Sequence, residues 1–273
     1  MKSPENVSDR HIFALYAERS LSLLSSRNVG QPCSIRDQDL WHRIAHVLHA
    51  RPGDEFVFFD DQKVIRLQLQ SLTTKGTVQG VMQDLWEAQP LTPRVNLFMG
   101  LLRRDAWSDV VYYAAQMGVT TITPLICAKT QREWGGEREL ERMKSVMIAA
   151  CEQAHQFVIP QINQPMIFDE ALCHHEFVAS ATTASVYGHA EGKPFFSTLQ
   201  TIVAQNPSTL TIVIGPEGGF TVQECSLLDQ AGVIGMALTP TILRSQEAVA
   251  VCVGVFRSSF FVPDAEQSQS TEI

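Results

Sequence analysis

The sequence lacks the patterns of a membrane, secreted or metal-binding protein. Its longest apolar run, residues 248–256, is far shorter than a membrane-spanning helix, and its polar first residues contain no apolar core of a signal peptide. The six cysteines form no Cys-x-x-Cys pair, so we expect free thiols in a reducing cytosol. The cluster at residues 173–175 has adjacent side chains that rarely converge on one ion. We therefore expect a cytoplasmic protein with no membrane partner and no metal.

Nucleotide-binding signatures and a basic net charge are also missing. There is neither a G-x-G-x-x-G motif nor a G-x-x-x-x-G-K-[ST] motif. The net charge is −8, of which residues 1–93 carry −1 and the remainder −7. Bulk charge therefore argues against general nucleic-acid binding, and the first third is the part that a polyanion would repel least.

The sequence contains enough residues, 273, for two modest domains, and its composition is that of a globular protein. Two prolines at residues 89–93 indicate a linker. Short strands before it, at 54–60, 64–69 and 76–81, predict a small β-barrel over residues 1–88. One helix is predicted at about 37–49, with an apolar face of Leu40, Ile44, Val47 and Leu48.

After the linker, strands alternate with helices. This rhythm predicts an α/β domain over residues 94–262, with a mostly parallel sheet that is covered on both faces. The polar stretch 263–273 predicts a disordered tail. We expect strands at 95–100, 121–126, within 177–187, 209–214 and 233–238, and helices at 106–117, 137–155, 194–204, from about 222 to 232, and at 246–261.

The stretch Gly-Pro-Glu-Gly-Gly at residues 215–219 lies between a predicted buried strand and a helix start. Thr221 and Glu224 have the spacing of a capping box, which places that helix start at about Val222. Three glycines leave bare backbone against which a flat ligand can lie. A strand, a glycine turn and a helix start are frequent at ligand sites in α/β proteins, although a tight connector remains the alternative reading.

A second loop, residues 239–247, follows a neighbouring predicted strand and contains Arg244. Ser245 is a candidate N-cap for the last helix. A cation at a helix start is unfavourable for the helix dipole, so Arg244 is a candidate for gripping a carboxylate, a phosphate or a developing anion. A surface salt bridge is the other interpretation of Arg244.

The charge of the first loop limits its ligand. Glu217 lies inside the glycine turn, where it would repel a phosphate at the helix N-terminus. A ligand with hydroxyls, amines and a positive charge fits better than a dinucleotide. S-adenosylmethionine, whose sulfonium is positive and which has no phosphate, meets this description.

The two loops together resemble those of the 16S ribosomal RNA (uracil-N3)-methyltransferases of the SPOUT superfamily. The resemblance rests on Gly-Pro-Glu-Gly-Gly-Phe at 215–220 and on Leu-x-Pro-x-Ile-Leu-Arg-Ser at 238–245. Segments at 118–125, 149–153 and 47–54 agree in position, so the likeness covers about residues 10–262.

The resemblance implies an N-terminal PUA-like β-barrel that binds RNA and a C-terminal SPOUT domain with a deep trefoil knot. It implies a homodimer that uses S-adenosylmethionine to methylate uridine N3 in the 16S rRNA of the small subunit. Arg244 would stabilise negative charge on the uracil, and Glu152 is a second catalytic candidate. The expected cofactor-binding residues are Thr182, Ile214, Gly215, Glu217, Gly218, Gly219, Leu238, Pro240, Leu243, Arg244 and Ser245.

The sequence departs from this family at several charged positions. The carboxylate that usually follows the arginine is displaced by one residue to Glu247, and one residue turns a helical side chain by about 100°. The other departures from the usual charges are His49, Tyr113, Gln116, Gln156, Thr241 and Gln246. Three alternatives follow: a relative that binds RNA without catalysis, a methyltransferase of another RNA, and an unrelated nucleotide-using α/β enzyme.

Overall fold

A computed structural model describes residues 12–18, 28–73, 76–174, 177 and 179–261. The chain divides into two compact units. The first comprises residues 1–89 and 148–159, and the second comprises 90–147 and 160–273. The boundary after residue 89 lies at the expected linker, but the first unit also includes the 148–159 segment, which the sequence did not indicate. The expected tail lies outside the described residues.

The first unit contains a five-stranded sheet. Its order is β1-β3-β4-β5-β2, with β1 parallel to β3 and the other pairs antiparallel. No pairing joins β1 to β2 among the described residues, so no closed barrel is detected in this part of the chain. Its core contains Phe56, Phe58 and Leu67. The strands are β1 (Phe13–Tyr16), β2 (Pro32–Arg36), β3 (Glu55–Phe59), β4 (Lys63–Leu72) and β5 (Thr77–Glu87).

The helix of the first unit begins as predicted but changes type. Asp37 caps the helix α2 (Gln38–His42) by accepting from the Leu40 backbone N–H, and a π-helical turn, η1 (Arg43–Val47), follows. Leu40 and Ile44 are buried as expected, whereas the side chain of Val47 is 61% exposed. A π-turn has more residues per turn than an α-helix, so Val47 rotates away from the face that the α-helical period predicted.

The second unit is an α/β fold around a parallel sheet with the order β12-β10-β11-β6-β7-β8, and β9 also pairs with β7. Its strands are β6 (Arg94–Gly100), β7 (Thr121–Ile126), β8 (Gln161–Ile162), β9 (Met166–Ile167), β10 (Thr183–Pro194), β11 (Thr209–Ile214) and β12 (Ile234–Ala237). Its helices are α3 (Arg104–Gln116), the first part of α4 (Glu137–Ala154), which from residue 148 belongs to the first unit, α5 (Phe168–Ala171), α6 (Phe195–Gln205), α7 (Val222–Gln230) and α8 (Ser245–Phe260). The predicted alternation is confirmed; β8, β9 and α5 are additional short elements.

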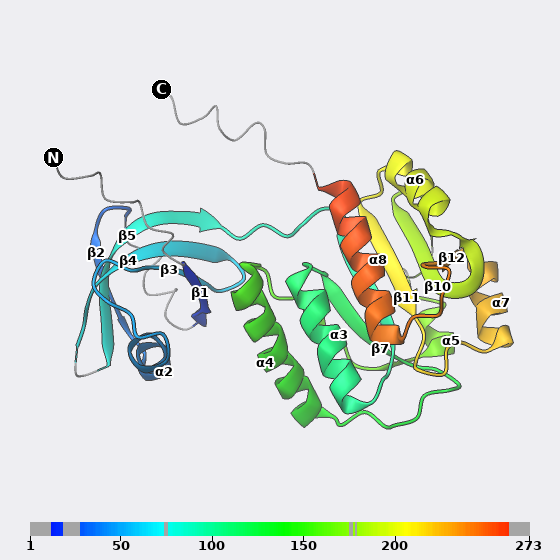
Figure 1. Cartoon of the computed structure of the whole chain (residues 1–273), viewed down its shortest axis with the longest axis horizontal. Helices are drawn as coiled ribbons and strands as arrows, with labels where there is room; N and C mark the ends of the chain where they lie inside the picture. The colour runs from blue at the N-terminus through cyan, green and yellow to red at the C-terminus, as the bar shows by residue number, and fades with distance from the viewer. Residues whose placement is uncertain (1–11, 19–27, 74–75, 175–176, 178, 262–273) are drawn as a thin grey trace. The chain divides into compact units, whose positions relative to one another are not determined.

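Helices cover both faces of this sheet. Phe98, Val213 and Tyr187 are aligned on adjacent strands and pack in one cluster with α5 and α7. On the other face, α3 and α8 lie side by side (Figure 1). All three strands are buried at their centres, which explains why β11 reads as a nearly continuous apolar run rather than as an alternating one.

Arg257, near the end of α8, joins that helix to two backbone segments of the second unit. Its guanidinium donates to the carbonyls of Pro93 at 2.7 Å, of Met117 at 3.0 Å, and of Gly118. Burial lowers the pKa of Arg257 to about 10, so the side chain remains charged at neutral pH. The contact fixes the last helix against the entry of β6 and the end of α3.

Candidate functional site

A cavity of about 620 Å³ lies in the second unit, at the ends of β11 and β12 and beside residues 188–191 of β10, where the pairing with β12 is irregular. The loops that follow the strands of a parallel sheet meet at this edge, which is the usual location of ligand sites in such folds. The volume falls in the range of small-molecule pockets. The lining residues are 188–191, 214–220, Val222, Cys225, Ser226, Asp229, Met236, Leu238, Thr239, Thr241, Ile242, Leu243, Ser245 and Ala248.

The glycine loop after β11 packs directly against the end of β6. A Cβ atom on Gly100 would lie 2.3 Å from the backbone N of Pro216, a distance that real contacts do not reach. The loop then turns back with a hydrogen bond from Gly219 N–H to the Pro216 carbonyl at 2.8 Å, and Gly219 has φ +65°. The close approach thus requires glycine at position 100, and the left-handed backbone favours it at position 219, where the loop lines the cavity.

The predicted capping box is present at the start of α7. Thr221 N–H donates to Glu224 Oε2 at 2.7 Å, and Glu224 N–H donates to Thr221 Oγ1 at 3.1 Å. Glu224 Oε1 also accepts from Ala128 N–H at 2.8 Å. Lys129 Nζ donates to the carbonyls of Gly218 and Phe220 at 2.9 and 3.0 Å. The loop after β7 therefore fixes the glycine loop through both side-chain and backbone groups.

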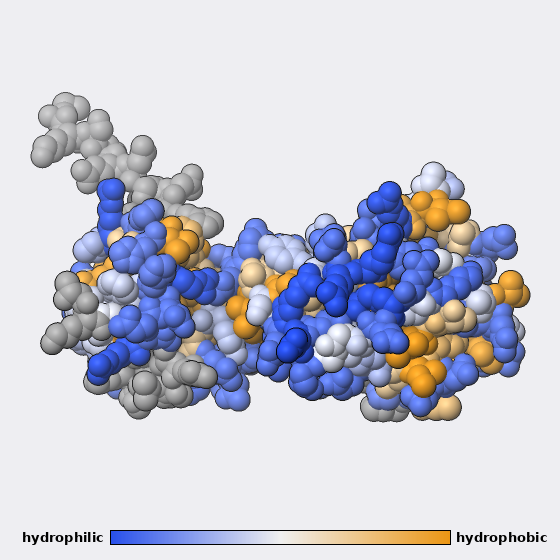
Figure 2. Space-filling view, turned by 90° about the horizontal axis from the view of Figure 1, so that it is seen from below, coloured by the Kyte–Doolittle hydropathy of each residue, from blue (hydrophilic) through white to orange (hydrophobic). Residues whose placement is uncertain are grey.

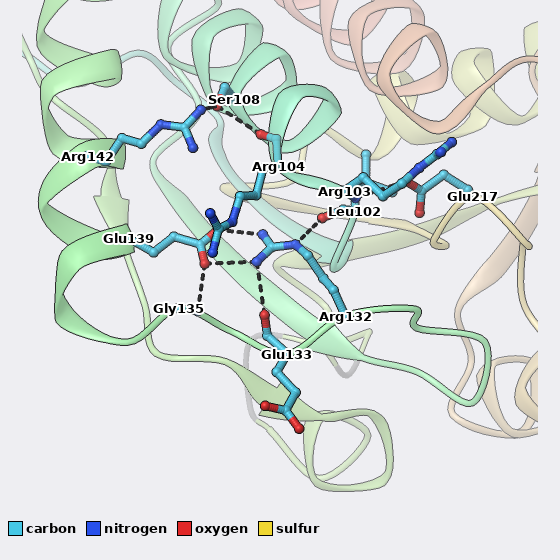
Figure 3. Close-up of polar contacts among 10 residues, drawn as sticks. All are labelled: Leu102, Arg103, Arg104, Ser108, Arg132, Glu133, Gly135, Glu139, Arg142 and Glu217. Carbon is cyan, nitrogen blue, oxygen red and sulfur yellow. Dashed lines mark hydrogen bonds and ion pairs between the residues drawn. The ribbon is translucent and has the colours of Figure 1, made fainter.

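Glu217 lines the cavity and also bonds to the start of α3. Its Oε1 accepts from Arg103 N–H at 2.9 Å, while Arg103 Nε lies 3.4 Å away (Figure 3). One carboxylate oxygen thus positions the loop, and Oε2 accepts no hydrogen bond from the described residues.

The cavity wall is acidic. Glu191, Glu217 and Asp229 contribute carboxylates, and the described lining contains neither lysine nor arginine. Asp229 Oδ1 accepts from Tyr187 Oη at 3.0 Å, and burial together with this bond raises the pKa of Tyr187. His189, another lining residue, stacks on the Tyr187 ring with centroids 5.7 Å apart. This wall favours a cationic ligand over a phosphate, as the position of Glu217 in the sequence predicted.

Most of the predicted cofactor-binding residues line this cavity, but three do not. Thr182 stands at the opposite end of β10, where its carbonyl accepts from Thr209 N–H and Ser208 Oγ. Pro240 is exposed and outside the lining. Arg244 is also exposed and outside the lining. The residues that do line it are Ile214, Gly215, Glu217, Gly218, Gly219, Leu238, Leu243 and Ser245.

Arg244 is the N-cap residue of α8, with an extended backbone and no side-chain capping bond. The prediction that Ser245 caps this helix is wrong, because Ser245 is already the first helical residue and is buried. The Arg244 side chain is exposed and does not contribute to the cavity wall, although both neighbours, Leu243 and Ser245, do.

Glu152, the second catalytic candidate, belongs to the first unit and does not line the cavity. Its carboxylate accepts two bonds from the Arg43 guanidinium, at 2.9 and 2.6 Å, and one from Tyr16 N–H at 2.9 Å. These bonds occupy both oxygens. The geometry therefore gives Glu152 a role in joining β1 to the π-turn.

The sequence interpretation missed one wall of the cavity and part of another. The first consists of residues 188–191, in β10, and the second of Cys225 and Asp229 on α7. The sequence did indicate residues 188–191, since they follow a predicted parallel strand just as the two recognised loops do. Asp229 gives no local signal, because its place depends on how α7 packs.

A buried ion pair supports the edge of the sheet beside the glycine loop. Arg132 pairs with Glu139 at 2.5 Å, donates to the Leu102 carbonyl, and is 14% exposed against 6% for Glu139 (Figure 3). Burial by itself would raise the pKa of Glu139, but hydrogen bonds from Arg132 and from Gly135 N–H lower it overall. The pair fixes the start of α4 against the end of β6.

Comparison with known proteins shows consistent similarity. A family model described as an RNA methyltransferase domain matches residues 89–257. Proteins named Ribosomal RNA small subunit methyltransferase E from Mycobacterium bovis and Bacillus subtilis are 25% and 24% identical over 228 and 213 residues. These alignments cover 81% and 76% of this chain and 84% and 82% of the relatives.

Solved structures show a similar fold. A crystal structure of Ribosomal RNA small subunit methyltransferase E from Neisseria gonorrhoeae, bound to S-adenosylmethionine, aligns with a TM-score of 0.73 and 21% identity. It covers 91% of this chain and 98% of that one. A putative methyltransferase from Legionella pneumophila, also with S-adenosylmethionine, aligns with a TM-score of 0.71 and 22% identity, with coverage of 91% and 98%.

Replacing Gly100 tests the close approach of β6 to the glycine loop. We expect Gly100→Ala to lower the free energy of unfolding by about 2 kcal/mol, because the added methyl collides with Pro216. Gly254→Ala is the control, since its Cβ would meet Met117 Sδ at an ordinary 3.5 Å inside α8. That change should stabilise the protein by up to about 1 kcal/mol. Urea unfolding measures both, and equal effects would contradict the packing argument.

The Arg132–Glu139 pair predicts a pH-dependent contribution to stability. The pKa of Glu139 is lower in the folded state than in the unfolded chain, so its contribution is complete above the unfolded value of about 4.3 and is lost as pH falls through the folded pKa. Glu139→Gln should cost about 3 kcal/mol at pH 7, and this difference should shrink below pH 4. The exposed Glu133, changed to Gln, is the control. A difference between wild type and Glu139→Gln that stays constant from pH 7 to 3.5 in urea unfolding would contradict the assignment.

Proposed function

The chain belongs to the RNA methyltransferase family, and we propose that it transfers a methyl group from S-adenosylmethionine to N3 of a uridine in the 16S rRNA of the small ribosomal subunit. The observation that carries the proposal is the cavity beside β10 and at the ends of β11 and β12, whose described wall has three carboxylates and neither lysine nor arginine. The names of the relatives and the S-adenosylmethionine in their solved structures support the choice of cofactor and substrate class.

The cavity fits the cofactor in shape and charge. Backbone groups of residues 215–219 and of Leu238 and Leu243 supply a surface for the flat adenine and ribose, and Glu217 and Asp229 offset the positive charge of the ligand. The bound cofactor supplies an electrophilic methyl group. The protein must hold the uracil in line with it at near-attack distance and exclude water.

Negative charge must be stabilised on the uracil, because N3 attacks only after it loses its proton. We assign this role to Arg244, which stands between two cavity-lining residues at the start of α8 and has no side-chain capping bond there. A guanidinium beside the ring carbonyls stabilises the developing anion. Glu152 positions β1 against the π-turn η1, since Arg43 and Tyr16 both donate hydrogen bonds to its carboxylate.

The architecture proposed with this function is that of the resembled family. We propose that residues 1–88 form a PUA-like barrel that binds RNA, that 94–262 form a SPOUT domain with a deep trefoil knot, and that two chains form the active dimer in the cytoplasm. The five-stranded sheet of the first unit, the parallel sheet of the second and the TM-score of 0.73 support this. No helix in the described parts of the chain is long and apolar enough to cross a membrane.

Neutralising the cavity carboxylates tests the cofactor. We expect Glu217→Gln combined with Asp229→Asn to weaken binding of S-adenosylmethionine about tenfold, which corresponds to roughly 1.4 kcal/mol. S-adenosylhomocysteine lacks the sulfonium charge, so its affinity should change less than about threefold. Titration calorimetry measures both, with the exposed Glu247→Gln as control. Equal losses for the two ligands would contradict the electrostatic role, and binding of ATP or NAD in preference to either would end the proposal.

Methyl transfer tests the reaction. Small subunits purified from cells lacking the protein should accept a labelled methyl group, and mapping should place it on uridine N3. Arg244→Ala should lower kcat on the order of 100-fold while the affinity for S-adenosylmethionine remains unchanged. Arg94→Ala, at the opposite end of β6, is the matched control. If the wild-type protein binds cofactor and RNA but transfers nothing, the alternative of a non-catalytic RNA-binding relative replaces the proposal.

A further inference from the structure

Three arginines beside the glycine loop form a connected series, which we term the arginine face: Arg103, Arg104 and Arg142. Arg142 donates to Ser108 Oγ at 2.6 Å, and Ser108 Oγ donates to the Arg104 carbonyl at 3.0 Å (Figure 3). Arg103 adjoins Arg104 in the chain and contacts Glu217 of the cavity wall. All three are exposed. The series thus leads from the cavity loop, across the start of α3, to α4.

The charges of this face are largely uncompensated. Among the described residues, neither Arg104 nor Arg142 has a carboxylate within ion-pair distance. Arg103 has a long contact of 3.4 Å to Glu217, and its side chain is 76% exposed. Exposed pairs of this kind are worth little, so all three guanidiniums are available to an external anion.

The buried pair beside the face occupies the carboxylate on which Arg104 also acts. Glu139, the nearest buried carboxylate, accepts two charge-assisted bonds from Arg132 and one from Gly135 N–H. Arg132 occupies the Glu139 carboxylate at hydrogen-bond distance, whereas Arg104, whose charge also lowers the pKa of Glu139, makes no ion pair with it. The same contacts fix the end of β6 and the start of α4, so the face rests on a rigid support.

Nearby acidic residues point off the face. Asp105 and Glu141 are each one residue from an arginine of the face, and one residue turns a helical side chain by about 100°. Residues 103–144 carry seven basic and six acidic side chains, so this segment is +1 in a chain of net charge −8. In Figure 2 the deepest blue, the colour of the most hydrophilic side chains, gathers in one band on the second unit.

We propose that the arginine face binds the phosphate backbone of the RNA substrate and guides the target nucleotide toward the cavity. Planar guanidiniums bind phosphate in a bidentate manner, and exposed arginines in series match the repeat of a nucleic-acid backbone better than a single anion. Its position beside the glycine loop places RNA next to the proposed methyl donor. The inference rests on the proposed function, which supplies RNA as the partner.

Salt-dependent RNA binding tests the face. The probe is 16S rRNA from cells lacking the protein, titrated against the protein from 50 to 300 mM KCl. Each lost phosphate contact lowers the slope of log K against log salt by about 0.7 for single strands. Arg104→Gln with Arg142→Gln should therefore lower the slope by about 1.4 and weaken binding at 0.1 M salt on the order of tenfold. Adding Arg103→Gln should remove about 0.7 more.

Matched variants separate a docking role from a structural one. Arg94→Gln with Lys193→Gln removes the same charge from exposed sites away from the face and should leave the slope within about 0.3 of wild type. Arg104→Lys with Arg142→Lys retains the charge and should restore most of the slope. Melting temperature and calorimetry with S-adenosylmethionine verify that fold and cofactor site are intact.

The outcomes distinguish the two proposals. Three results would contradict RNA binding by the arginine face. These are an unchanged salt slope in the Arg104→Gln/Arg142→Gln variant, an equal loss of slope in the control variant, or binding of the wild type to polyglutamate as tightly as to RNA. If wild type methylates subunits under those results, the proposed function still stands. If the slope falls as expected but the wild type transfers no methyl group, RNA binding by the arginine face is supported and the proposed function is contradicted.

Discussion

The close approach of β6 to the glycine loop is the constraint on which the site depends. Gly100 has no side chain because the backbone of Pro216 occupies that space, and Glu217 reaches across to the N–H of Arg103 just beyond the strand. The end of one strand and the loop of its neighbour thus form a single rigid edge. The cavity on one side and the arginine face on the other both take their positions from this contact.

Elements whose causes are local were predictable from the sequence. A few neighbouring residues determine each of these elements: the Thr221–Glu224 capping box, the glycine turn and the buried strand β11. The π-turn at Arg43–Val47 was not predictable, because an α-helical period fitted the same apolar residues. There the tertiary contacts of Arg43 with Glu152, 109 residues away, accompany the local change of helix type.

The same distinction between local and tertiary causes applies to the residues of the candidate site. Residues 214–219 were predicted as a ligand loop because backbone conformation, turn chemistry and strand position coincide there. Asp229 was missed because only the packing of α7 against Tyr187 brings it to the wall. Thr182 was placed at the wrong end of β10, since the sequence indicated a strand within 177–187 without fixing the end at which its loop meets the cavity. The family resemblance supplied the chemistry, and the geometry determined which residues can take part.

The hydrogen bonds of Arg257 determine which part of the second unit must be synthesised before its fold is complete. Its guanidinium satisfies the carbonyl of Pro93, 164 residues earlier and next to the first strand of that unit, and also those at the end of α3. These carbonyls have no such partner while the ribosome is still adding the residues before α8. Domains generally fold as units as the chain emerges, but this one cannot complete these hydrogen bonds until α8 has left the ribosome. The native state of the second unit is therefore reached only after α8 has been synthesised.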